Sequence, residues 1–155
     1  DKSIVTVDLK EERRVVTQKV VEGQFTAMAQ SARGERELVS VDHMGVVKMW
    51  DCDVVGKPVH SFVTHTERDD EMGREKRVNH ISISPATADA DAGRFVAIAA
   101  AAGDLQIWEL SDSSQPVSIG MAHSHEVAQA AWAPDGKQIV SVGLDHCVCV
   151  WNFFE

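Results

Sequence analysis

The chain is poor in cysteine and in aromatic side chains, and it contains no tyrosine. Cys52, Cys147 and Cys149 are an odd number of cysteines and provide no disulfide framework, so we expect a reducing, intracellular setting. No run of roughly 18 apolar residues occurs, and the sequence therefore predicts no membrane-spanning helix.

Clustered positive charge is also missing. The 155 residues include 24 acidic and 15 basic side chains, which gives a net charge of −9. Phosphate contacts need clustered Lys and Arg, so this balance disfavours nucleic-acid binding. We expect other proteins as partners, and a location that is cytoplasmic (cytoskeletal or ciliary included) or nuclear. Nothing in the sequence implies a cofactor.

What the chain does contain is a repeat. Short alternating apolar runs end at Val7, Trp50, Trp108 and Trp151, which lie 43, 58 and 43 residues apart. A period of about 40–45 residues that ends in Trp-Asp or a variant is typical of a four-stranded propeller blade. Such a unit cannot bury its own faces and must stack on its neighbours. Since no window has a sustained helical stripe, the sequence predicts an all-β fold.

The last repeat surrounds its tryptophan with a set of polar residues and turn residues. They are His123, the turn Pro134-Asp135-Gly136, Ser141, Asp145 and the pair Trp151-Asn152. Together they resemble a blade of the WD-repeat family, and the resemblance covers nearly the whole chain at the level of blades. It implies that His123, Ser141, Asp145 and Trp151 form one hydrogen-bonded chain. Losing one member of such a chain would cost roughly 1–3 kcal/mol per orphaned group.

The earlier repeats depart from this pattern. Ser40 and Trp50 align with the last repeat, but Met44 replaces the turn aspartate and Gln24 stands where histidine is expected. Asp42 would substitute only by changing the turn. In the middle repeat Trp108 remains, while residues 95–100 contain no hydroxyl, and His65 is the candidate to fill the missing histidine's place.

Three repeats and a leading strand predict a partial propeller of four-stranded antiparallel blades that this chain alone does not close. We expect residues 1–22 to be the outer strands of an incomplete blade and residues 23–63 to be a complete blade. Residues 64–120 form a blade with insertions at 66–77 and 86–93, and residues 121–155 form a last blade without its outer strand. Further blades of the same chain or of another copy would complete the ring.

Two chemical alternatives start from the same residues. Ser141, His123 and Asp145 are the residue types of a hydrolase triad, but Ser141 is expected mid-strand between covered sheet faces, where it could not act as a nucleophile. Cys147 and Cys149, with His125 and His146 nearby, are potential zinc ligands, but the usual ligand spacing is absent. We therefore expect neither a catalytic site nor a metal site.

The function indicated is a non-catalytic scaffold for protein–protein interactions. Two alternatives are a structural component of a large microtubule-based or ciliary assembly, and a substrate-recruiting subunit of a ubiquitin ligase. The latter family usually has an arginine two residues after the Trp-Asp pair, where this chain has Asp53 after Trp50-Asp51. We expect the loops of one face to carry the partner surface. The charged insertion belongs to this face, either as a solvated spacer or as a segment that orders on a partner. The candidate residues of the partner surface are Asp42, His43, Met44, Glu67, Arg68, Asp69, Asp70, Arg74, His125, Glu126 and His146.

Overall fold

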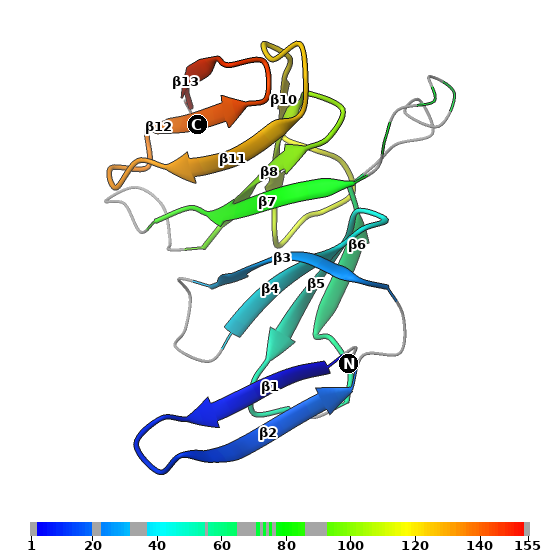
Figure 1. Ribbon diagram of the computed structural model, residues 1–155, viewed down its shortest axis with the longest axis vertical. Helices are drawn as coiled ribbons and strands as arrows, with labels where there is room; N and C mark the ends of the chain where they lie inside the picture. Colours follow the sequence, from blue (N-terminus) through cyan, green and yellow to red (C-terminus); the bar gives the residue numbers. More distant parts are fainter. Residues whose placement is uncertain are drawn as a thin grey trace.

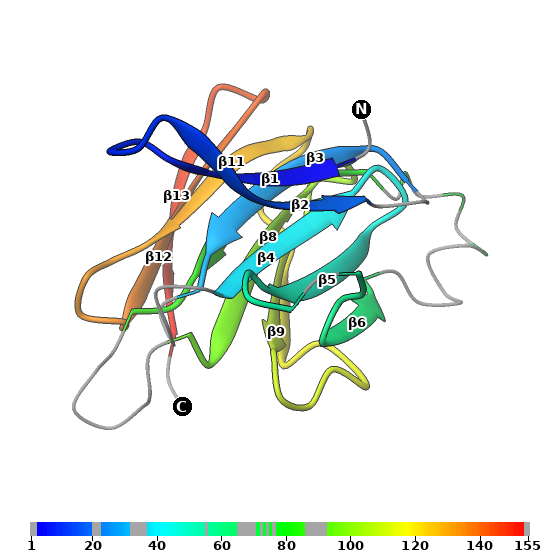
Figure 2. The same cartoon turned by 90° about the horizontal axis from the view of Figure 1, so that it is seen from below.

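The computed structural model describes residues 3–19, 23–31, 37–54, 56–64, 71, 73, 75, 77–85 and 93–153. In these residues the chain forms thirteen strands, arranged in four antiparallel sheets that follow one another along the long axis (Figure 1). Seen from below, the sheets overlap one behind another (Figure 2). The predicted all-β fold, with an arrangement that does not close on itself, is confirmed.

The first sheet is a two-stranded hairpin. Its strands are β1 (Ser3–Asp8) and β2 (Arg13–Lys19), and the register between them shifts once, at Thr6/Val7. In the described residues no further strand pairs with this hairpin.

The second and third sheets each contain four strands in the order in which they follow along the chain. Side chains alternate between the two faces of each strand, and β8 is apolar on both faces. The second sheet consists of β3 (Phe25–Gln30), β4 (Glu37–Asp42), β5 (Val46–Asp51) and β6 (His60–Val63). The third consists of β7 (Val78–Ile83), β8 (Phe95–Ala100), β9 (Leu105–Glu109) and β10 (Ser118–Gly120).

The last sheet contains three strands. They are β11 (Val127–Trp132), β12 (Gln138–Gly143) and β13 (Val148–Asn152). Trp50, Trp108 and Trp151 therefore lie in β5, β9 and β13, the third strands of three successive sheets. Their equivalence is the one expected from the spacing of the repeats.

The core lies between the sheets rather than inside any one of them. One cluster, which includes Val39, Val47, Ile98 and Trp108, fills the space between the second and third sheets. A second cluster, which includes Ala97, Ile107, Val127 and Ile139, fills the space between the third and last sheets. All six residues of β8 are buried because apolar neighbours cover both of its faces. No helix in the described part of the chain is long and apolar enough to cross a membrane.

The strand pairing is offset from the repeat that is counted from one tryptophan to the next. β10 pairs with β9, but the residues that follow β10 lead directly into β11 of the next sheet. The inner strands β3, β7 and β11 lie side by side. Residues 121–126 therefore connect the outer strand of one sheet to the inner strand of the next, and they carry His123 to the end of the last sheet (Figure 1).

Candidate functional site

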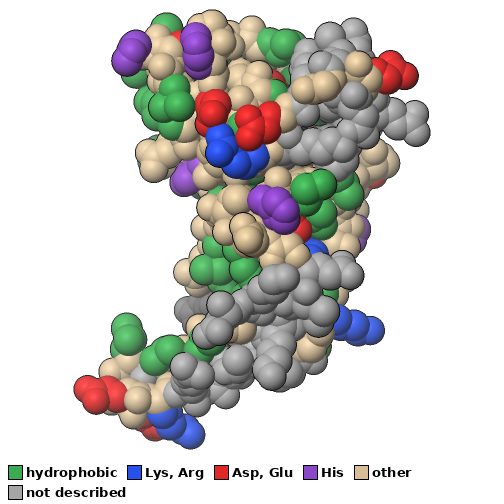
Figure 3. Space-filling view, turned by 45° about the vertical axis from the view of Figure 1, so that its right-hand side comes forward, with side chains coloured by type: hydrophobic (Ala, Val, Ile, Leu, Met, Phe, Trp, Pro, Cys, Tyr) green, Lys and Arg blue, Asp and Glu red, His purple; other side chains and the backbone are tan. Residues whose placement is uncertain are grey.

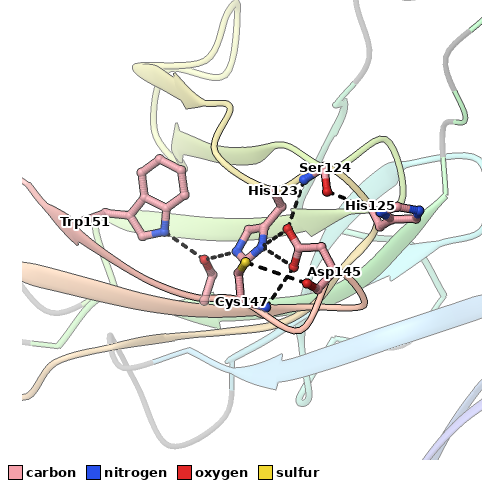
Figure 4. Close-up of polar contacts among 7 residues, drawn as sticks. His123, Ser124, His125, Asp145, Cys147 and Trp151 are labelled. Atoms are coloured by element: carbon pink, nitrogen blue, oxygen red, sulfur yellow. Dashed lines mark hydrogen bonds and ion pairs between the residues drawn. The ribbon is translucent and has the colours of Figure 1, made fainter.

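Four polar side chains form a continuous network in the last sheet (Figure 4). The indole Nε1 of Trp151 donates to Oγ of Ser141 over 2.8 Å. The same Oγ lies 2.8 Å from Nε2 of His123, and Nδ1 of His123 lies 3.0 Å from Oδ1 of Asp145. The structure thus brings together the four residues that the resemblance implied, from a connection, two strands and a turn.

The charge state of Asp145 fixes the direction of the network. Desolvation raises the pKa of Asp145, but the hydrogen bond from His123 lowers it, as do those from the backbone N–H groups of Ser124 and Cys147. The net result is a decrease from 3.8 to about 2. The ionised carboxylate only accepts hydrogen bonds, so Nδ1 of His123 carries the proton. The other ring nitrogen, Nε2, then lies within hydrogen-bonding distance of the Ser141 hydroxyl.

The backbone packs closely around this network. Asp145 accepts from the backbone N–H of Ser124 over 2.9 Å and from that of Cys147 over 3.1 Å, so one carboxylate ties two loops together. A Cβ on Gly143 would lie 2.5 Å from Nδ1 of His123 and 2.6 Å from Oδ1 of Asp145. Glycine at 143 is therefore what allows the imidazole and the carboxylate to approach each other.

Ser141, His123 and Asp145 are connected in the same order as a hydrolase triad. The side chain of Ser141 is only 1% exposed, however, and its oxygen already accepts the indole N–H of Trp151. A catalytic serine must reach substrate and lie beside oxyanion donors. This geometry instead gives the hydroxyl a bridging role. Trp151 is only partly buried, because no further sheet covers its end of the described structure.

In the third sheet, called the middle sheet below, the indole N–H of the tryptophan has a different acceptor. Nε1 of Trp108 donates to Oε1 of Gln106 over 2.9 Å, and Nε2 of Gln106 donates to Oδ2 of Asp104 over 2.7 Å. This partner was not predicted, because a hydroxyl was expected in the preceding strand. The signal was present in the alternation Asp104-Leu105-Gln106-Ile107-Trp108, since residues two apart on a strand share a face. His65, the substitute proposed from the sequence, lies outside the described residues.

The first complete blade keeps only the central bond. Nε1 of Trp50 donates to Oγ of Ser40 over 2.8 Å. Asp42 is 4% exposed and accepts from the backbone N–H groups of Met44 and Val46, over 2.9 and 3.0 Å. Asp42 therefore stabilises its own turn rather than replacing the missing turn aspartate at position 44.

Several predicted partner-surface residues lie at the ends of the sheets where these turns gather. His43, Met44, His125 and His146 are exposed, while Asp42 is buried. Glu126 is partly buried, and its Oε2 accepts from Nη2 of Arg77 over 2.7 Å and from Nδ2 of Asn79 over 3.3 Å. Figure 3, with this side turned toward the viewer, shows histidines near the top and the middle and paired acidic and basic side chains between them. Glu67, Arg68, Asp69, Asp70 and Arg74 lie outside the described residues.

Two cysteines, Cys147 and Cys149, follow the turn of Asp145 near this face. In the part of the chain that the structure describes, no group of three or more His, Cys, Asp or Glu side chains is placed to hold a metal ion. Burial raises the pKa of Cys149, as do the nearby Cys147 and Asp145, so this thiol favours its protonated form. A protonated thiol is a poor metal ligand and a poor nucleophile.

Comparison with known proteins adds a family to this geometry. The chain is 28% identical over 108 residues to "WD repeat and SOCS box-containing protein 1" of Mus musculus, a match that covers 70% of the chain and 22% of the mouse protein. This similarity supports the resemblance to WD-repeat proteins that the sequence indicated. The chain is also 26% identical over 117 residues to "Protein HIR1" of Kluyveromyces lactis, covering 66% of the chain and 12% of that protein. The chain thus spans less than a quarter of the length of either relative, and no family model matches it.

Proposed function

We propose that the chain is a non-catalytic scaffold that binds another protein through the loop-bearing face formed by residues 42–45, 101–104, 123–126 and 143–147. This face, called the loop face below, is supported by one observation above all. Its turns are fixed by hydrogen bonds at their bases, while four side chains at their tips stay exposed: His43, Met44, His125 and His146. A rigid frame with exposed tips lowers the ordering cost of binding.

Contacts between neighbouring loops support the same proposal. A Cβ on Gly103 would lie 3.0 Å from the backbone oxygens of both His123 and His125, so the two loops approach each other at backbone level. The Arg77–Glu126 ion pair and the hydrogen bond from Asn79 Nδ2 to the oxygen of Val127, over 2.9 Å, tie the third sheet to the last. These contacts join the parts of the loop face that the third and last sheets contribute into one surface.

The test is partner capture by the protein with its loop tips altered. Replacing Met44 and His125 by Glu should abolish capture, since both side chains are exposed and neither holds the network together. Lys137→Glu is the matched control, because the turn between β11 and β12 lies at the opposite end of the strands. Equal capture by all variants, with unchanged circular dichroism, would rule out the loop face as the binding surface.

The charged insertion needs a separate experiment. We propose that residues 66–77 are a solvated spacer beside the loop face, because runs of mixed charge usually remain solvated. Deleting residues 67–75 should then leave capture unchanged. Loss of capture with an intact fold would instead make the insertion the binding site. The narrower roles, in a microtubule-based assembly or in a ubiquitin ligase, remain hypotheses about the partner that this face holds.

A further inference from the structure

A serine and a histidine from different sheets meet at the end of the sheets that lies opposite the loop face. Ser113 belongs to the loop of residues 110–117, between β9 and β10, and His60 is the first residue of β6. Oγ of Ser113 lies 2.8 Å from Nε2 of His60, so this loop of the third sheet lies beside the outer strand of the second (Figure 2). His60 is exposed and Ser113 is partly exposed. The pair belongs neither to the loop face nor to the network around Trp151.

Three serines lie in this loop, and their hydrogen bonds distinguish them. Oγ of Ser111 donates to Oε1 of Glu109 over 2.9 Å, and Oγ of Ser114 donates to Oδ1 of Asp112 over 3.1 Å. A phosphoryl group on either serine would therefore lie beside a carboxylate, which repels it. Ser113 differs from both, because its partner is an imidazole, which can take up a proton.

The imidazole of His60 is suited to two states of the serine oxygen. A neutral imidazole with its proton on Nδ1 accepts a hydrogen bond at Nε2, and a serine hydroxyl bonded to a base in this way is activated as a nucleophile. A protonated imidazole instead donates at Nε2 and carries a positive charge, which favours an anionic group on the same oxygen. The pair therefore fits a hydroxyl before reaction and a phosphate after it.

We propose that Ser113 is a phosphorylation site, at which His60 first accepts the hydroxyl proton and then pairs with the phosphate. Residues 111–112 and 114–115 are exposed on either side of it, so a protein kinase carrying a nucleoside triphosphate can reach the loop. Oγ of Ser113 bonds to the γ-phosphorus, the bond between that phosphorus and the bridging oxygen breaks, and the nucleoside diphosphate leaves with the electron pair. The hydroxyl proton moves to Nε2 of His60. The product is a phosphate beside an imidazolium.

Phosphorylation at this position strengthens a contact between two sheets. Phe62, two residues after His60 on β6, packs on Trp108 of β9 with ring centroids 5.1 Å apart, and the ring centroids of His60 and Phe62 are 6.2 Å apart. The phosphate and His60 thus form their ion pair close to this aromatic contact. The pair adds a charged interaction to the apolar one that already joins the second and third sheets.

The first test is where phosphate is incorporated. The 155-residue chain is incubated with magnesium ATP and a protein kinase that accepts serine beside acidic residues, and the modified positions are located by mass spectrometry of proteolytic peptides. Incorporation at Ser113 is expected to exceed that at Ser111 and Ser114 severalfold. His60→Gln keeps a hydrogen-bond acceptor but takes up no proton, and it should slow incorporation at Ser113 by about tenfold or more. A peptide of residues 109–117, which lacks His60, should lose the preference.

The second test is the effect of the phosphate on the folded chain. Phosphoserine at position 113 should raise the midpoint of urea denaturation at neutral pH, and the rise should be absent in His60→Gln. The ring-nitrogen resonances of His60 should move to their imidazolium positions only in the phosphorylated parent. No incorporation at Ser113, a preference for Ser111 or Ser114, or equal rates at Ser113 in the parent and His60→Gln overturns the proposal. A lower midpoint after phosphorylation overturns the pairing of His60 with the phosphate.

Discussion

The middle and last sheets provide an acceptor for the indole N–H of their tryptophan from different parts of the chain. In the last sheet, the indole N–H of Trp151 begins a network that includes residues from a connection, two strands and a turn. In the middle sheet, Trp108, Gln106 and Asp104 all lie within five consecutive positions. The constraint common to both is that a largely enclosed indole N–H needs an acceptor. Which residue supplies that acceptor is free to change.

The two sheets also differ in how their apolar faces are covered. Trp108 is 2% exposed, with neighbouring sheets on both sides, while Trp151 is only partly buried. The middle sheet therefore gains its stability mainly from burial. The last sheet depends more on polar ties, which connect its loops and orient its turn. Variants at equivalent positions in different sheets can test this division.

The largest effect is expected at Gly120, the last residue of β10. A Cβ there would lie 2.3 Å from Cζ3 of Trp151, while the equivalent position in the second sheet holds Phe62, which packs on Trp108. Gly120→Val should lower the free energy of unfolding by about 3 kcal/mol, because the indole must move. Urea denaturation measures this. Ile119→Ala, on the same strand but 47% exposed, is the control and should change little.

Removing the hydroxyl that accepts the indole N–H should lower the free energy of unfolding less than Gly120→Val does. The loss should differ between the last and second sheets. Ser141 connects Trp151 to His123, so Ser141→Ala leaves two groups without a partner and should lower the free energy of unfolding by about 2 kcal/mol. Ser40 serves only Trp50 among its described hydrogen bonds, and Ser40→Ala should cost about 1 kcal/mol. Equal losses for the two variants would show that the longer network adds nothing.

The difference in burial can be tested with isosteric substitutions. Val47 in β5 and Val148 in β13 are equivalent, and they are 0% and 67% exposed. Val47→Thr places a hydroxyl in the core between two sheets and should cost about 1 kcal/mol or more. Val148→Thr should be nearly neutral in urea denaturation of the isolated chain. A matching loss at Val148 would mean that its face is covered in solution.

The smallest expected effect is a dependence on acid. The pKa of Asp145 is lowered from 3.8 to about 2, so its ionised form stabilises the folded state at pH values above 3.8. That contribution is lost progressively as pH falls through about 2. Following the urea midpoint between pH 5 and pH 2 should show a drop in the parent that is smaller in Asp145→Asn. Parallel curves for the two proteins would contradict the assignment.

The sequence predicted well what depends on local pattern. The tryptophans that end the repeats fall in equivalent strands, because alternation and turn residues act over a few positions. It also predicted which residues gather around Trp151, through the resemblance to a known blade. It did not predict the acceptor for Trp108, or that Trp151 is partly exposed. The exposure of Trp151 depends on which sheets are neighbours, and a single repeat carries no record of that, whereas the acceptor for Trp108 lies two residues away on the same strand.

The offset between repeat and sheet has a consequence for how such a chain can change in length. Since β10 follows Trp108 in sequence but pairs with β9, a cut directly after Trp108 separates β10 from its sheet, whereas a cut between residues 120 and 121 leaves the third and last sheets whole. Duplicating or deleting a unit counted from one tryptophan to the next therefore cannot add or remove a self-contained part. An inserted unit must supply an outer strand to the sheet before it and must pair its own sheet with a strand from the unit after it. Growth of the array by recombination is thus restricted to units whose borders are compatible, however much their interiors have diverged.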